Sequence, residues 1–112
     1  MAGIRRQRVA EAVREELGRM LQQELKDPRI GLASIVQVEM SPDLRHARVY
    51  VSVYGSAQEQ AMRALAGARG WLRRELGRRL QLRHVPELTF VADPSIRHGA
   101  HISELLRRLH ED

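Results

Sequence analysis

The segment ALAGARGWLRRELGRRL, residues 64–80, decides how the rest of the chain is interpreted. Its leucines and arginines are typical of a helix, but Gly67 and Gly70 interrupt the pattern three residues apart. Glycine costs the interior of a helix about 1 kcal/mol relative to alanine, so a pair of glycines needs a reason. We therefore expect GARG, residues 67–70, to separate two consecutive helices.

Apolar residues with the spacing of helices or strands predict the other elements on either side of this junction. They are a helix at 4–26, strands at 34–40 and 47–55, a helix capped by Ser56 and Glu59, a helix after Gly70, a strand at 87–93 and a short helix at about 101–110. Val49, Val51 and Val53 alternate on one face of the second strand, which we expect to cover a core. Trp71 is expected in that core.

The order α-β-β-α-α-β, with a short C-terminal helix, predicts an α+β fold in which a three-stranded sheet packs on helices. It is the order of type II KH domains, which clamp nucleotides with a GXXG loop between two helices. GARG occupies the position of that loop. Its glycines would let a phosphate approach the backbone, and the next helix would present its N-terminal N–H groups. We expect a single KH-like domain over residues 1–112, with the C-terminal helix appended.

Positive charge is concentrated beside the same junction. The chain has 19 basic and 14 acidic residues, a formal net charge of +5. Residues 69–84 hold six arginines and one acid, Glu75, so this segment carries the whole excess. The arginines are Arg69, Arg73, Arg74, Arg78, Arg79 and Arg83. With Glu75 as the only nearby acid, we expect their outward face to be almost purely cationic and to bind a polyanion.

Several classes of protein are disfavoured by the sequence. It has no cysteine, which removes disulfides and thiolate metal sites. Neither a signal peptide nor a membrane span is visible, so we expect a cytoplasmic protein. No enzyme motif, cofactor motif or paired carboxylates are found, and no cofactor is expected. His98 and His101 have a spacing that can hold a metal ion, but the sequence identifies no third ligand. We therefore expect no metal to bind there.

Five stretches within about residues 5–106 form a recognisable set. They are RVAEAVREEL, KDPRIG, VYVSVYG, DPSIRHG and, most specifically, LRHVPELTF. In these stretches the chain resembles the ribosome-binding factor A family of bacterial assembly factors. In that family an Ala-X-Gly kink replaces the GXXG loop, and Ala68, Arg69 and Gly70 fit it. Because Gly67 precedes them, both motifs are present, and the junction is either a kink, which the register of the match favours, or a short open loop.

The resemblance implies a non-enzymatic RNA-binding protein that binds the immature 30S subunit and assists maturation of 16S ribosomal RNA. Its expected partners are 16S ribosomal RNA and possibly ribosomal proteins, and it should be a monomer, because no apolar stripe is left over. The expected RNA-binding residues are Ala68, Arg69, Gly70, Arg73, Arg74, Arg78, Arg79 and Arg83. Two alternatives stay open: a general nucleic-acid-binding module, or a hydrolase or metal enzyme around His98 and His101.

Overall fold

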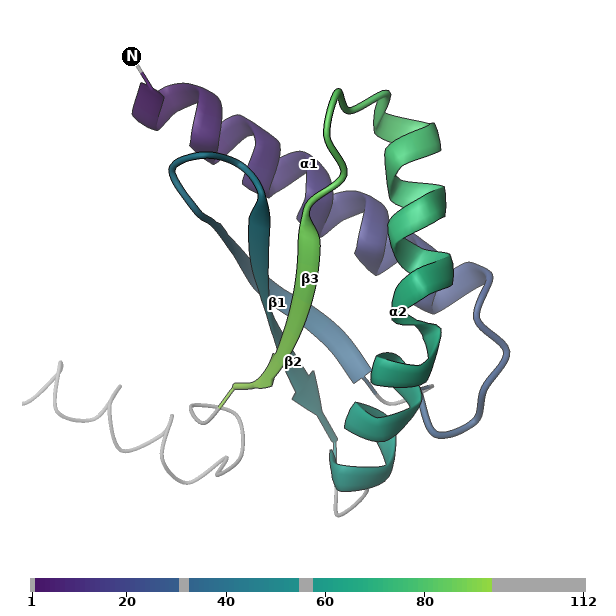
Figure 1. The fold of residues 1–112 in the computed structure, drawn as a ribbon. Helices are drawn as coiled ribbons and strands as arrows, with labels where there is room; N and C mark the ends of the chain where they lie inside the picture. Colours follow the sequence, from purple (N-terminus) through teal and green to yellow (C-terminus); the bar gives the residue numbers. More distant parts are fainter. Residues whose placement is uncertain (1, 31–32, 55–57, 94–112) are drawn as a thin grey trace, which may run out of the picture.

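The computed structural model describes residues 2–30, 33–54 and 58–93, which form two helices and a three-stranded sheet (Figure 1). The elements are α1 (Ala2–Gln23), β1 (Ala33–Met40), β2 (His46–Val53), α2 (Gln58–Leu80) and β3 (Glu87–Ala92). In the sheet, β2 lies between β1 and β3 and pairs antiparallel with β1 and parallel with β3. Both helices pack on one face of the sheet. The expected α+β fold is confirmed.

The core forms where the inward face of the sheet meets the apolar stripes of the two helices. Val49, Val51 and Val53 of β2 are buried, as their alternation predicts, and helix α1 contributes Val13 and Leu17. Trp71 packs against this core with part of its side chain exposed. No polar side chain is buried among the described residues, so apolar packing is the main stabilising contribution.

A β-bulge in β1 explains why its sequence does not alternate cleanly. Ile35 lies opposite Val51, and Gln37 lies opposite Tyr50, so Val36 has no partner of its own in the pairing. The extra residue shifts the inward positions of the strand, and Val38 and Met40 are buried after it. The bulge therefore keeps apolar side chains on the core side along the whole strand.

The two consecutive helices expected around GARG are in fact one helix. Helix α2 runs without a break from Gln58 to Leu80, and Gly67 and Gly70 lie inside it (Figure 1). Neither glycine takes a positive φ, and a Cβ at Gly67 would meet no other atom within 4 Å. The described part of the chain thus has the order α-β-β-α-β. The backbone geometry of α2 therefore does not require glycine at positions 67 and 70.

Three other expectations fall outside the described residues. These are the Ser56 cap, the C-terminal helix at about 101–110 and the pair His98 and His101, at which no metal is expected. Among the residues that are described, no group of three or more side chains is placed to hold a metal ion. Within the same ranges, neither helix is long and apolar enough to cross a membrane.

Candidate nucleic-acid interface

The exposed side of α2 carries a strip of small residues, Ala66, Gly67 and Gly70, which we call the small-residue strip. Positions 67, 70 and 74 share one face of a helix, because residues three and four apart are neighbours. A Cβ added at Gly70 would lie 3.8 Å from Nη1 of Arg74, so the Arg74 guanidinium borders the strip. The strip is therefore an exposed, shallow stretch of helix with a cation at its end. Ala68, by contrast, is half-buried against the core.

Three of the six expected arginines are free to meet a ligand. Arg69, Arg74 and Arg83 are exposed and form no ion pair with any residue in the described ranges. Arg69 and Arg74 lie on α2, whereas Arg83 lies in the connection 81–86, after the helix has ended at Leu80. Free, exposed guanidinium groups are suited to phosphate, which they bind through paired N–H donors.

Arg73 has a structural role that its sequence position did not reveal. Its Nε and Nη2 atoms donate to the backbone oxygens of Pro86 and Val85, each at 3.0 Å. Nη2 also lies 3.5 Å from Glu87. The side chain thereby ties the connection 81–86 back onto α2, and its hydrogen-bonding capacity is largely used within the protein.

One turn further along α2, Gly77 packs against the same connection. A Cβ at this position would lie 2.4 Å from Cγ2 of Val85, closer than real Cβ atoms come to other atoms. Sequence reasoning missed Gly77, and the only available signal was a third glycine within the helical segment. Together, Arg73 and Gly77 fix the connection that carries Arg83.

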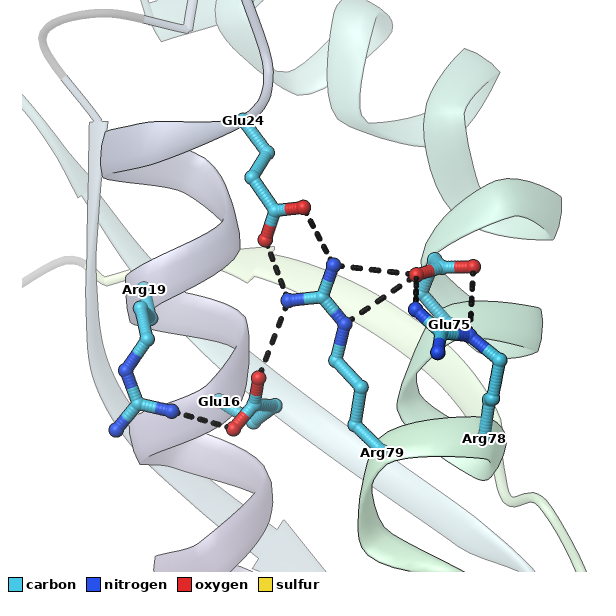
Figure 2. A network of polar contacts seen from close by, with 6 residues as sticks. All are labelled: Glu16, Arg19, Glu24, Glu75, Arg78 and Arg79. Atoms are coloured by element: carbon cyan, nitrogen blue, oxygen red, sulfur yellow. Dashed lines mark hydrogen bonds and ion pairs between the residues drawn. The ribbon is translucent and has the colours of Figure 1, made fainter.

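Arg79 is the centre of an ion-pair network between the two helices, shown in Figure 2. It contacts Glu16 at 3.2 Å and Glu75 at 3.1 Å, and it forms a two-pronged pair with Glu24. Only 19% of its side chain is exposed. Hydrogen bonding to Glu24, and secondarily to Glu16 and Glu75, raises the pKa of Arg79 further above its ordinary value. Arg79 therefore joins α1 to α2 and is not free to bind phosphate.

The network also engages Arg78 and Arg19. Arg78 pairs with Glu75 at 2.7 Å, and Arg19 pairs with Glu16 at 2.6 Å. The expectation that Glu75 is the only acid near the arginines is therefore wrong, because Glu16 on α1 and Glu24 directly after α1 reach Arg79. Such pairs between distant segments have no local sequence signal. The cationic face is narrower than the sequence predicted.

We expect the network to make the protein sensitive to acid. The pKa of Glu24 is lowered by its hydrogen bonds from Arg79, and the pKa of Glu75 by those from Arg78 and then Arg79. Because these folded-state values lie below the ordinary 4.5, the stabilisation is complete above about pH 4.5. It is lost as the pH falls through the lowered values. Arg79→Met should lower the free energy of unfolding at pH 7. It should also make that free energy fall less steeply as the pH is lowered.

Urea unfolding between pH 7 and pH 3 measures the effect. The control is Arg63→Met, which removes an exposed pair with Glu59 on the same helix and should retain the wild-type acid dependence. An Arg79→Met protein whose stability falls as steeply with acid as that of the wild type would contradict the assigned role of the network.

Comparison with known proteins gives a consistent result. A sequence model of the family described as Ribosome-binding factor A matches residues 5–106. The protein of that name from Thermomicrobium roseum is 47% identical over 114 residues, which cover all of this chain and 88% of the relative.

Two structures of the same name are also similar. The crystal structure of ribosome-binding factor A from Thermus thermophilus is 33% identical, with a TM-score of 0.63 over 78% of this chain and 90% of that one. A homology model of the Thermus thermophilus protein, fitted into a cryo-electron microscopy map of a 30S complex, is 35% identical. Its TM-score is 0.58, over 71% of this chain and 90% of that one. The expected KH-like fold is consistent with these structures.

Proposed function

Since the chain belongs to the ribosome-binding factor A family, we propose that it binds the small ribosomal subunit and assists maturation of 16S ribosomal RNA. The family is one of ribosome-binding factors and not of enzymes. The observation that supports the proposal most strongly is the match over residues 5–106, together with the similarity to a protein fitted in a 30S complex.

The part of the molecule that meets RNA is the exposed face of α2 with the connection after it. Arg69, Arg74 and Arg83 are the cations available for phosphate. The small-residue strip lets the RNA backbone lie close to the helix, since no side chain stands above Gly67 and only the Arg74 guanidinium lies near Gly70, at an ordinary contact distance. Close approach is thus the reason for two glycines that the helix itself does not need.

The continuous helix changes one step of the expected mechanism. An interior residue of an α-helix donates its N–H to the carbonyl four residues earlier, so Gly70 has no free N–H for a phosphate. The phosphate is therefore held by guanidinium groups at the sides of the strip, not by the N-terminus of a helix. Arg73, Arg78 and Arg79, with Ala68, support the site through contacts within the protein.

In this role the protein acts in the cytoplasm as a single KH-like domain and a monomer. Bound to a precursor subunit, it holds one segment of 16S ribosomal RNA in a fixed conformation, and its release lets assembly continue. The phosphate contacts supply affinity, and the shape of the structured RNA around α2 supplies selectivity.

Sedimentation of a cell extract tests the proposal. We expect the protein to migrate with free small subunits and to be depleted from mature ribosomes. Competition with duplex DNA should not release it at equal nucleotide concentration. A protein found only at the top of the gradient would contradict the proposed role. Release of the protein from small subunits by duplex DNA at equal nucleotide concentration would also contradict it and would favour a general nucleic-acid-binding module.

A further inference from the structure

A groove of about 400 Å³ opens where three segments of the chain meet. They are the first half of α1, the turn between β1 and β2, and the connection 81–86; Figure 1 shows them at one end of the molecule, remote from the start of α2. Its lining includes Arg5, Val9, Asp43, Leu44, Leu82 and Arg83. The volume lies in the range of small-ligand sites, about 300–1,000 Å³.

The walls of the groove are apolar and are built with some backbone strain. Val9, Leu44 and Leu82 are half-buried, so each keeps part of its apolar surface available. Leu44 has a φ of 62°, a left-handed conformation that leucine rarely adopts and that glycine or asparagine would take more easily. Glycine would relieve the strain but would also remove the side chain that lines the groove. Strained residues of this kind gather at binding sites.

The charges around the groove favour an anionic ligand. Arg5 and Arg83 are exposed and form no ion pair within the described residues. The one acid, Asp43, accepts hydrogen bonds at Oδ1 from the Ser41 hydroxyl at 2.6 Å and from the Arg45 amide at 3.0 Å. These bonds lower the pKa of Asp43 and stabilise its charge within the turn. The two arginines are therefore left for a ligand.

We propose that this groove binds one unpaired nucleotide of the RNA, with its phosphate between Arg5 and Arg83 and its base against Val9, Leu44 and Leu82. The inference rests on the proposed function, since it assigns a second RNA contact to the same protein. Proteins recognise single-stranded RNA in this way, by holding splayed bases on side-chain surfaces and phosphates on arginine.

Asp43 favours a nucleotide over an acidic peptide as the ligand of the groove. A carboxylate in the groove repels the carboxylates of such a peptide. It accepts a hydrogen bond, however, from the amino group of cytosine or adenine. Both donors within the turn bind Oδ1, which leaves Oδ2 to face a base. Uracil has no amino group, so the groove prefers cytosine, adenine or guanine, which have one, over uracil.

Nuclear magnetic resonance of the full chain with labelled methyl groups tests the site. The probes are hexanucleotides of adenine, cytosine or uracil. We expect the adenine and cytosine probes to shift the methyl signals of Leu44 and Leu82, and the uracil probe to bind about fivefold more weakly. Arg5→Gln should weaken binding of the cytosine probe about tenfold. The adjacent Arg6→Gln, which does not line the groove, should change it by less than about twofold.

The result that would overturn the inference is specific to the groove. It is the absence of methyl shifts with all three probes while the wild-type protein still binds purified small subunits. In that case the proposed function stands and the groove is not a nucleotide site. Methyl shifts produced by small-subunit proteins, but not by the RNA probes, would overturn it equally. If the wild type bound no small subunit, the proposed function itself would fail.

Discussion

Replacing Arg69, Arg74 and Arg83 together with glutamine is expected to weaken binding to small subunits roughly 100- to 1,000-fold. A charge-assisted hydrogen bond contributes about 1.5 kcal/mol or more, which corresponds to about tenfold in affinity for each contact. The three side chains are exposed and unpaired within the described residues, so folding should be little affected. The dependence of log affinity on log salt should become shallower by about 2, at ~0.7 per contact with unpaired RNA.

A matched control removes the same charge elsewhere. Arg14, Arg29 and Arg63 are also arginines on the surface, but each pairs with a nearby acid. The triple glutamine variant of these residues should bind within a fewfold of the wild type and retain its salt dependence. Equal losses for the two triple variants would show that net charge alone drives binding, and the assigned arginines would lose their special role.

The second large effect is on stability, where Gly77→Ala should lower the free energy of unfolding by about 1–3 kcal/mol. The new Cβ would lie 2.4 Å from Cγ2 of Val85, so the connection 81–86 must move away from α2. This cost exceeds the gain of about 1 kcal/mol that alanine brings to a helix interior. The displacement would also weaken the two hydrogen bonds from Arg73 to the connection.

Three further variants isolate the cause. Val85→Ala removes the atoms that the new Cβ would strike, so the double variant should lose less than the sum of the two single losses. Gly18→Ala makes the same substitution in α1, where a Cβ meets nothing within 4 Å, and it should stabilise by up to about 1 kcal/mol. Urea unfolding measures all four proteins. Strict additivity of Gly77→Ala and Val85→Ala would contradict the proposed contact.

The sheet was predictable because its signals are local. The alternation of Val49, Val51 and Val53 follows from a strand with one buried face, and the structure confirms it. The bulge at Val36 was not predictable, since it depends on which residues β1 meets across the sheet. A register shift of this kind leaves only a break in alternation, which a loop or a strand end would also produce.

The continuity of α2 was not predictable from the glycines. The local preference against Gly67 and Gly70 costs about 1 kcal/mol for each. It is outweighed by a buried stripe that continues on both sides, from Ala61 and Leu65 to Leu72 and Leu76. Breaking the helix would misalign these two halves against one core. Tertiary packing therefore overrides the intrinsic preference of residues 67–70.

The sequence predicts where the arginines of the candidate site lie, but not which of them are free of contacts within the protein. The concentration of arginine after residue 68 predicts exposed cations on α2 and the connection, and Arg69, Arg74 and Arg83 are exposed there; their contact with RNA stays a prediction. Which arginines are free depends on partners far away in sequence: Glu16 and Glu24 for Arg79, and the backbone of Val85 and Pro86 for Arg73. Spacing along one helix cannot reveal these partners.

The binding of a Gly67→Gln/Gly70→Gln variant to purified small subunits tests the central claim most directly. Both glycines lie inside a helix with open space or ordinary contact distances above them, so glutamine should leave the protein at least as stable as the wild type. If the RNA backbone lies against the small-residue strip, the two new side chains should lower the affinity more than about tenfold. Gly18→Gln on α1 is the control, with unchanged affinity. A stable Gly67→Gln/Gly70→Gln protein that binds small subunits as tightly as the wild type would contradict the assignment of this face to RNA.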